Sequence, residues 1–180
     1  LLIASWRVAE KTIYPLVVFS QTVPKIAIAP LFAIWLGMTS LPHILITLLI
    51  SFFPIVIDTV AGLKSLPLEM VHLSQSMGTS RWQMFRKIRL PFALPFLFAG
   101  LKVAITLAVV GAIVGEWVGS EKGLGYVLLL ANGQLDTALA FSAIIILTLM
   151  GMGLFFIVWI LEKLLTSWHV SERVKEIEGI

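Results

Sequence analysis

The sequence has 180 residues, of which 59% are hydrophobic and 13% are charged, and its mean hydropathy is +1.01. Soluble domains carry about 25% charged residues, so this composition excludes an ordinary soluble enzyme or binding module and indicates lipid as the main solvent. The net charge is +3, but the basic residues lie in short segments between apolar runs. This distribution is typical of membrane proteins and argues against nucleic-acid binding.

The sequence has no cysteine, which excludes disulfides and cysteine metal sites, and we expect no metal site.

Four apolar stretches are long enough to cross a bilayer core about 30 Å thick, which takes roughly 20 helical residues. In chain order they are residues 16–37, 41–63, 92–118 and 138–161. We therefore predict an all-α fold, a polytopic transmembrane helical bundle that forms a single domain over residues 1–180. Because an apolar run is cut off at Leu1, we expect a fragment that lacks at least part of a preceding helix.

The distribution of charge predicts the orientation of these spans. Residues 64–91 carry five basic side chains against the single acid Glu69, whereas residues 119–136 carry one base against two acids. Basic loops stay on the cytoplasmic side, so we predict a cytoplasmic loop at 64–91 and an external loop at 119–136. The charged tail, residues 162–180, is then cytoplasmic.

Charged residues inside the spans are candidates for a translocation path, because a charge at the bilayer centre costs about 2.5–3.5 kcal/mol. Lys25 lies next to Pro24 in the first stretch, and Asp58 lies in the second. Prolines such as Pro30 and Pro54 leave backbone carbonyls that need polar partners. The alternative is that Lys25 and Asp58 lie near the cytoplasmic interface and extend their charged ends to water.

Three glycines recur at four-residue spacing in the third stretch, at Gly111, Gly115 and Gly119. This spacing places them on one face of a helix, where a second helix can approach closely. The pattern predicts tight helix packing, either within the chain, which we favour, or against a second copy.

The loop at 64–91 has the signals of two short helices. Pro67 and Glu69 suit a helix start, and Gly78 suits the position just after a helix end. Thr79 or Ser80 can cap a second helix, which is basic and aromatic and would end at Pro91. Such a helical knob could dock in a groove of a soluble partner or lie on anionic lipid.

This loop resembles the cytoplasmic EAA loop of binding-protein-dependent ABC importer permeases, whose pattern is Glu-Ala-Ala, three residues, Gly, nine residues, Ile-x-Leu-Pro. Gly78, Ile88, Leu90 and Pro91 match at the right separation, whereas residues 72–74 read His-Leu-Ser. The Glu of the family pattern thus has no counterpart at residue 72, which is His. Residues 24–37, 78–95 and 115–119 are also similar to the family. Residues 119–136 are most similar to its nitrate, sulfonate and taurine branch, which includes riboflavin and thiamine-precursor permeases.

The resemblance implies a type I ABC importer permease in the cell membrane, with four of the six spans of its branch present here. It also implies that two copies of the permease form the pore as a homodimer, and that an external binding protein delivers a small solute. A separate ATPase dimer would bind ATP and Mg. This chain itself would then need no cofactor and would not be an enzyme. The coupling contacts implied are Glu69, His72, Leu73, Ser74, Gly78, Arg81, Trp82, Phe85, Ile88, Leu90 and Pro91.

Three other functions compete with this interpretation. An enzyme is disfavoured because His43, His72 and His169 form no metalloprotease motif and no G-x-S-x-G or P-loop is present. An ion-coupled secondary transporter could use Asp58 and Glu116 as proton carriers, and Glu116 is thereby a third candidate for the path. The last alternative is a structural membrane subunit without transport activity.

Overall fold

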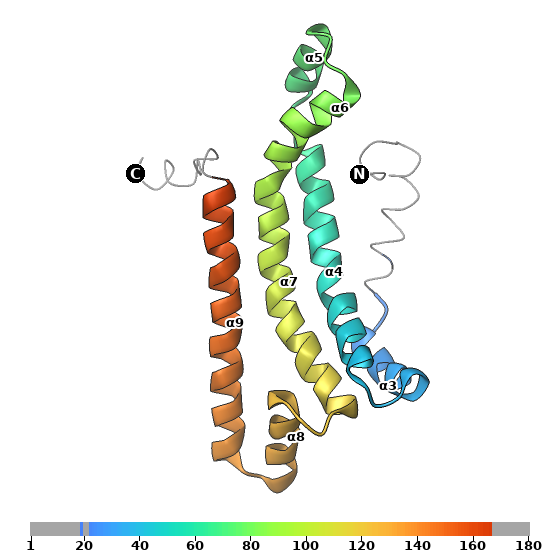
Figure 1. The fold of residues 1–180 in the computed structure, drawn as a ribbon, viewed down its shortest axis with the longest axis vertical. Helices are drawn as coiled ribbons and strands as arrows, with labels where there is room; N and C mark the ends of the chain where they lie inside the picture. The colour runs from blue at the N-terminus through green and yellow to red at the C-terminus, as the bar shows by residue number, and fades with distance from the viewer. Residues whose placement is uncertain (1–18, 20–21, 167–180) are drawn as a thin grey trace.

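The structure is a computed structural model that describes residue 19 and residues 22–166, and its fold is shown in Figure 1. The described residues form helices joined by short connections, which confirms the all-α prediction. In chain order the helices are α3 (Lys25–Leu36), α4 (Ser40–Lys64), α5 (Leu68–Ser76), α6 (Arg81–Met84), the π-helix η1 (Phe85–Arg89), α7 (Leu90–Gly119), α8 (Leu124–Gln134) and α9 (Thr137–Leu165).

The predicted count of four spans is wrong for the described residues, which hold three helices long and apolar enough to cross a membrane. Within the predicted span 16–37, the described part contains only α3, a helix of 12 residues, preceded by a bend at residues 22–24. Pro24 accounts for the break, because proline lacks an N–H and disfavours helical backbone at the preceding residue. Residues 16–18 and 20–21 of that span, and the tail beyond residue 166, lie outside the described residues.

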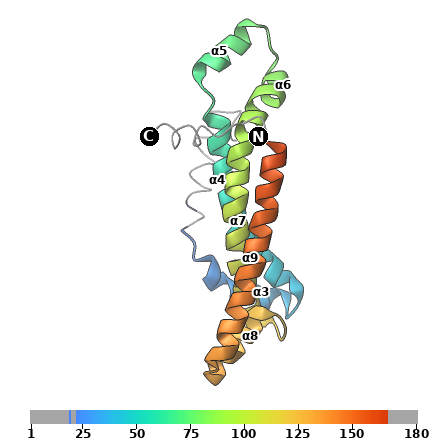
Figure 2. The same ribbon diagram turned by 90° about the vertical axis from the view of Figure 1, so that its left-hand side faces the viewer.

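The other three predicted spans agree within a few residues with the helices α4, α7 and α9, and α7 belongs to a longer continuous rod, Arg81–Gly119. Figures 1 and 2 show α4, α7 and α9 running roughly along one axis, with α5 and α6 projecting beyond one end. We call this the loop end. The opposite end carries α3 and α8, and we call it the α8 end.

Helices α4 and α7 form an antiparallel pair that is held together by glycine contacts. A Cβ atom added at Gly111 would lie 2.8 Å from the Cα of Thr47, and one at Gly115 would lie 3.0 Å from the Cα of His43. Both distances are too short for a side chain, so only glycine permits this approach of the two backbones. The glycine stripe therefore packs within the chain, as predicted.

The same close packing continues toward the loop end, where the sequence analysis did not predict it. A Cβ atom at Gly100 would lie 2.9 Å from the carbonyl oxygen of Pro54, and one at Gly62 would lie 2.6 Å from the Cβ of Phe96. Gly62 belongs to α4, so glycines of both helices take part. The pair is in contact over most of its length and is the most extensively packed pair of helices in the described chain.

Replacing Gly111 with valine should separate α4 from α7, because the new side chain would overlap the Thr47 backbone. Overpacking of this kind costs about 1–3 kcal/mol or more. We expect a markedly lower unfolding temperature in detergent, measured by fluorescence-detected size-exclusion chromatography after heating. Gly153→Val on α9 is the matched control, because a Cβ at Gly153 meets nothing within 4 Å. Equal stability of the two variants would contradict the packing account.

Helix α9 has far less contact with the rest of the chain. Only 6% of its most apolar 18-residue window is buried, against 28% for the rod that contains α7. Its side chains are largely aliphatic and aromatic, as expected for a surface covered by lipid or by further helices. Asp136 caps its start by accepting a hydrogen bond from the Leu139 N–H at 3.0 Å. At the α8 end, the short helix α8 lies between α7 and α9.

Candidate functional site: the helical loop and the polar residues of the spans

The helical loop between α4 and α7 begins with α5, whose start follows the predicted pattern. Pro67 occupies the residue before the helix, and Glu69 lies in its first turn. A carboxylate there is favourable because it faces the positive end of the helix dipole. The proline fixes the entry of the chain, so the orientation of α5 is defined from its first residue.

A bend at Gly78 ends α5 and has the hydrogen bonds of a Schellman motif. The Thr79 N–H donates to the carbonyl of Ser74 at 3.1 Å, and the Gly78 N–H donates to the carbonyl of Gln75 at 2.9 Å. Gly78 adopts φ +70°, which costs any residue with a side chain more than it costs glycine. The Thr79 hydroxyl also donates to the Ser74 carbonyl. The prediction of a helix end at Gly78 is confirmed.

A capping box starts the second helix, α6. The Ser80 hydroxyl accepts from the Gln83 N–H at 3.2 Å, and the Gln83 side chain accepts from the Ser80 N–H at 3.1 Å. These reciprocal bonds satisfy two donors that a helix start leaves free. Of the two predicted caps, Ser80 is the one used.

The prediction that Pro91 ends this second helix is wrong. Helix α6 continues through the π-helix η1 into α7, so that Arg81–Gly119 is one rod. In the wide turn the Leu90 N–H donates to the Phe85 carbonyl. A regular α-turn would press the Pro91 ring against the carbonyl of Lys87, and the wider turn relieves that overlap. The loop is therefore joined to the membrane-spanning helix without a flexible break.

Large apolar side chains are exposed on this loop. The exposed fractions of Leu73, Met77 and Trp82 are 64%, 77% and 65%. Trp82 also stacks on Phe85, with ring centroids 5.9 Å apart. Exposed apolar groups gathered at one end of a helical bundle make this loop a candidate for a contact surface. We call Leu73, Met77 and Trp82 the loop patch.

The remaining predicted coupling residues differ in their accessibility. Ser74 is buried, with 4% of its surface exposed, and its hydroxyl donates to the Val71 carbonyl at 2.9 Å. Ser74 thus stabilises the bend, because its carbonyl accepts hydrogen bonds from Thr79. It does not belong to the exposed surface of this chain. Glu69, His72, Gly78, Arg81 and Leu90 are exposed, whereas Phe85, Ile88 and Pro91 are half-buried.

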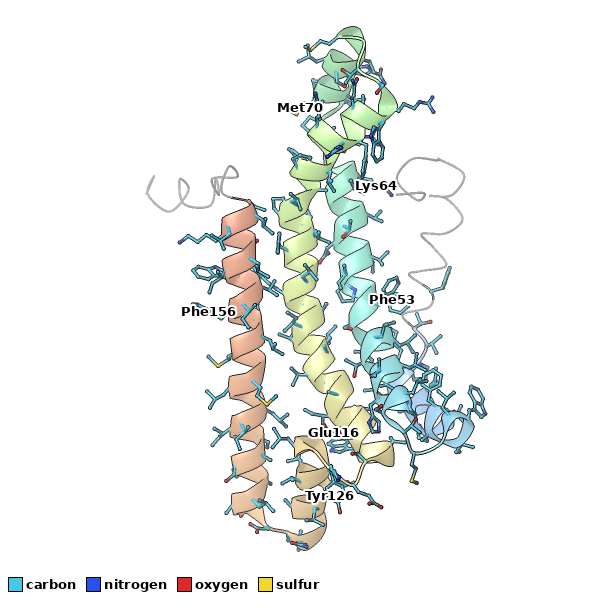
Figure 3. All side chains as sticks on the ribbon, viewed as in Figure 1. Phe53, Lys64, Met70, Glu116, Tyr126 and Phe156 are labelled. Atoms are coloured by element: carbon cyan, nitrogen blue, oxygen red, sulfur yellow. The ribbon has the colours of Figure 1, made fainter. Side chains whose placement is uncertain are left out.

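Lys25 and Asp58 do not form an ion pair with each other in the described part of the chain. The Lys25 ammonium lies over the Phe53 ring, 4.4 Å from its centroid, which is a cation–π geometry. Asp58 is half-buried and faces α7, where its Cβ lies 3.0 Å from the position of a Cβ at Gly100. Figure 3 labels Phe53 on α4.

Glu116 caps the start of α8. Its carboxylate accepts a hydrogen bond from the Gly125 N–H at 2.6 Å, and a side chain at Gly123 would overlap that carboxylate. Figure 3 shows Glu116 near the end of α7, close to Tyr126 of α8. An acid at a helix start satisfies free N–H groups and the helix dipole together. The sequence analysis named Glu116 for the translocation path and missed this structural role.

Replacing Glu116 with alanine should loosen α8, because the Gly125 N–H would lose its partner. Loss of a side-chain cap costs about 0.5–2 kcal/mol, and we expect faster amide hydrogen exchange at residues 124–127 without loss of membrane insertion. Glu121→Ala is the control, since Glu121 is exposed in the same connection. Unchanged exchange in the Glu116 variant would contradict the capping role.

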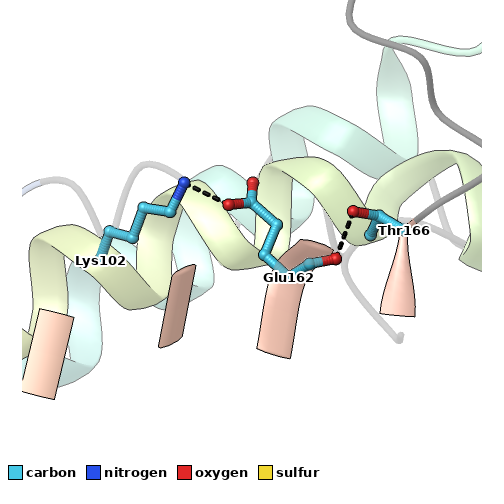
Figure 4. A network of polar contacts seen from close by, with 3 residues as sticks. All are labelled: Lys102, Glu162 and Thr166. Carbon is cyan, nitrogen blue, oxygen red and sulfur yellow. Dashed lines mark hydrogen bonds and ion pairs between the residues drawn. The ribbon is translucent and has the colours of Figure 1, made fainter. Parts of the chain in front are cut away.

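A half-buried ion pair that sequence reasoning missed joins α7 to α9. Lys102 and Glu162 form this pair, and their side chains are only 23% and 21% exposed. Figure 4 shows the contact and the neighbouring Thr166, whose hydroxyl donates to the Glu162 carbonyl at 2.6 Å. Lys102 is a charge inside the predicted span 92–118, and this alone could have singled it out. Its partner could not be identified without knowing how α9 packs.

No candidate metal site is found in the part of the chain that the structure describes. No group of three or more His, Asp or Glu side chains there could hold a metal ion. His43 and His72 lie at opposite ends of the fold, on α4 near the α8 end and on α5, and His169 lies outside the described residues.

Membrane-length helices, a glycine-packed pair and a helical loop rigidly joined to α7 define a multi-pass α-helical protein of the cell membrane. The family model for "Binding-protein-dependent transport system inner membrane component" matches residues 1–168. The chain belongs to this family.

Several curated permeases are similar to this chain. It is 38% identical to the riboflavin transport system permease protein RibX of Chloroflexus aurantiacus, over 92% of this chain and 62% of that protein. It is 41% identical to the formylaminopyrimidine transport permease protein ThiX of Halalkalibacterium halodurans, over 91% and 65%. It is 29% identical to the taurine transport system permease protein TauC of Escherichia coli, over 86% and 56%. The chain thus spans less than two thirds of the length of these three relatives.

Proposed function

We propose that this chain is the pore-forming part of a permease that imports a small organic solute, driven by ATP hydrolysis on a separate ATPase. Family membership and the similarity to transport permeases support this function. The observation that carries the proposal is the rigid connection from the loop patch through α6 and η1 into α7. A partner that moves the loop would move a membrane-spanning helix with it.

The geometry of the loop suits a docking contact with a protein. Helix α5 is fixed at its start by Pro67 and at its end by the Schellman motif at Gly78, so it can transmit force without unfolding. The loop patch offers apolar groups for a groove on the partner, which is a common mode of helix recognition. In this proposal the loop end faces the cytoplasm, Glu69, His72, Arg81 and Leu90 flank the contact, and Phe85, Ile88 and Pro91 support it from within.

We further propose the partners that such an importer needs. An ATPase dimer holds the two loops of a permease pair, which we take to be two copies of this chain, and it binds ATP and Mg. A substrate-binding protein delivers the solute at the α8 end. Riboflavin, a thiamine-precursor pyrimidine, taurine, a sulfonate or nitrate are the candidate solutes. Lys25, Asp58 and Glu116 stay candidates for the path.

Solute uptake by the full-length protein, reconstituted in lipid vesicles with its ATPase and binding protein, tests this proposal. We expect uptake that requires ATP on the ATPase side and persists when the proton gradient is collapsed. Uptake that is abolished by collapse of the gradient and is independent of ATP would instead identify an ion-coupled carrier. Absence of uptake of every candidate solute under both conditions would favour a structural subunit.

A further inference from the structure

An apolar groove lies between α7 and α9, with Leu128 of α8 at its edge. Its volume is about 570 Å³, within the range of about 300–1,000 Å³ that ligand sites occupy. Its largest side chains are Met152, Phe155 and Phe156 of α9, and Figure 3 labels Phe156 on that helix. These three side chains are all exposed, so the groove is open along α9. None of the described residues that line it has a titratable side chain.

The two hydroxyl groups that line this groove have no hydrogen left for a ligand. The Thr106 hydroxyl donates to the Val103 carbonyl at 2.7 Å, and the Thr148 hydroxyl donates to the Ile144 carbonyl at 2.8 Å. The groove thus offers a ligand neither a charge nor a side-chain donor. A polar solute would lose its hydration there without replacement, which is costly. A hydrocarbon chain has no such requirement and therefore suits the groove.

One face of α9 continues from the groove toward the loop end. Steps of three and four residues place Met152, Phe156, Trp159 and Lys163 on this face. The Phe156 and Trp159 rings are stacked with their centroids 5.3 Å apart, and the Lys163 ammonium lies over the Trp159 ring, 5.3 Å from its centroid. At 1.5 Å per residue, Lys163 lies about 10 Å beyond Phe156 along the helix. Tryptophan and lysine at the end of an apolar helix are typical of the level of the lipid headgroups.

The polar end of this face carries a positive charge. Lys163 is exposed, and its neighbour Glu162 is already paired with Lys102, so the three charges leave one cation in excess. Basic groups between membrane helices attract anionic headgroups. The open side of the groove is formed by bulky side chains, whereas faces that pack against another helix are rich in small residues. The apolar groove and the cation at its end together match a phospholipid with a negative headgroup.

We propose that this groove binds one anionic phospholipid from the leaflet at the loop end. One acyl chain lies against Met152, Phe155 and Phe156, and the phosphate lies at Lys163. The bound lipid fills the part of the boundary between α7 and α9 that protein contacts leave open, and so helps to hold the loosely packed α9. This inference needs only the membrane location of the chain and is independent of the proposed import function.

Native mass spectrometry of the full-length protein in detergent, after removal of co-purified lipid, tests this site. Phosphatidylglycerol and phosphatidylcholine with identical acyl chains are the two probes. We expect saturable binding of one phosphatidylglycerol per chain and weaker binding of phosphatidylcholine. Lys163→Gln should weaken phosphatidylglycerol binding about fivefold, because one basic group near the headgroup is lost, and should leave phosphatidylcholine binding unchanged. Thr148→Phe should weaken the binding of both lipids, because the ring occupies the groove.

Each variant has a matched control. Lys87→Gln removes the same charge from another exposed lysine toward the loop end. Ser142→Phe adds the same ring to α9 at an exposed residue that does not line the groove, and Ser142 also donates to a carbonyl of its own helix. We expect both controls to bind phosphatidylglycerol as the wild type does.

Equal affinity of the wild type for the two lipids would overturn the proposal, as would a variant that binds lipid no more weakly than its control. Dissociation of the permease pair in Thr148→Phe, with lipid binding unchanged, would instead assign the groove to a helix of a second copy.

Discussion

Replacing Gly78 with valine is expected to abolish ATP-driven uptake while the protein still inserts into the membrane. The residue adopts φ +70°, where a β-branched side chain costs about 1–2 kcal/mol or more. The cheaper response of the chain is to leave the Schellman geometry, which would release the hydrogen bonds to Ser74 and Gln75. Helix α5 would then lose its fixed angle to α6, and the loop patch would no longer present one surface.

Co-purification of the ATPase with the tagged permease measures this effect directly. We expect at least a tenfold reduction in bound ATPase for Gly78→Val. Gly133→Val is the control, because a Cβ at Gly133 meets nothing within 4 Å and its backbone has no positive φ. Normal recovery of the ATPase with the Gly78 variant would contradict the docking role of the loop.

The second large effect is expected at the ion pair between α7 and α9. Replacing Glu162 with leucine leaves the Lys102 ammonium largely buried without its partner, and breaking a buried pair costs about 3 kcal/mol or more. Replacing both residues, as Lys102→Met/Glu162→Leu, removes the charge together with its partner. We therefore expect the double variant to be more stable than either single variant, although α9 is otherwise only loosely packed.

Thermal unfolding of the four members of this double-mutant cycle in detergent gives the coupling energy. Lys163→Met is the control, since Lys163 is exposed on the same turn of α9 and lies over the Trp159 ring at 5.3 Å. We expect the control to stay within about 1 kcal/mol of the wild type. Additive losses in the cycle would show that the pair does not hold α9 against α7.

Features set by local chemistry could be predicted from the sequence. The bend at Gly78 and the cap at Ser80 depend on hydrogen bonds within a few residues. The local sequence is therefore sufficient to predict where α5 ends and α6 begins. The glycine stripe at Gly111 and Gly115 was also predictable, because three glycines on one helix face leave few alternatives to close packing. The membrane spans α4 and α9 followed from length and hydropathy.

Features that depend on backbone geometry or on distant contacts could not be predicted. Hydropathy does not depend on backbone geometry and therefore gives no sign of the break at Pro24. For this reason the predicted span 16–37 includes the short helix α3. The wide turn at η1 lets the helix continue past Pro91, so that Pro91 lies inside one continuous rod. Proline inside a helix usually ends or kinks it, so the sequence favours a helix end there. The cap formed by Glu116 and the pairing of Lys102 both need the packing of helices that are separate in the sequence.

We propose that residues 66–90 form a cytoplasmic contact held by the ATPase. Because these 180 residues contain no cysteine, single cysteines can be introduced as Met77→Cys in the loop patch and Glu121→Cys near the α8 end. In sealed vesicles of known orientation, an impermeant maleimide should label the Met77 variant only from the cytoplasmic side and the Glu121 variant only from outside. A short crosslinker should also join the Met77 variant to the ATPase. Labelling of the Met77 variant from the external side would contradict the account.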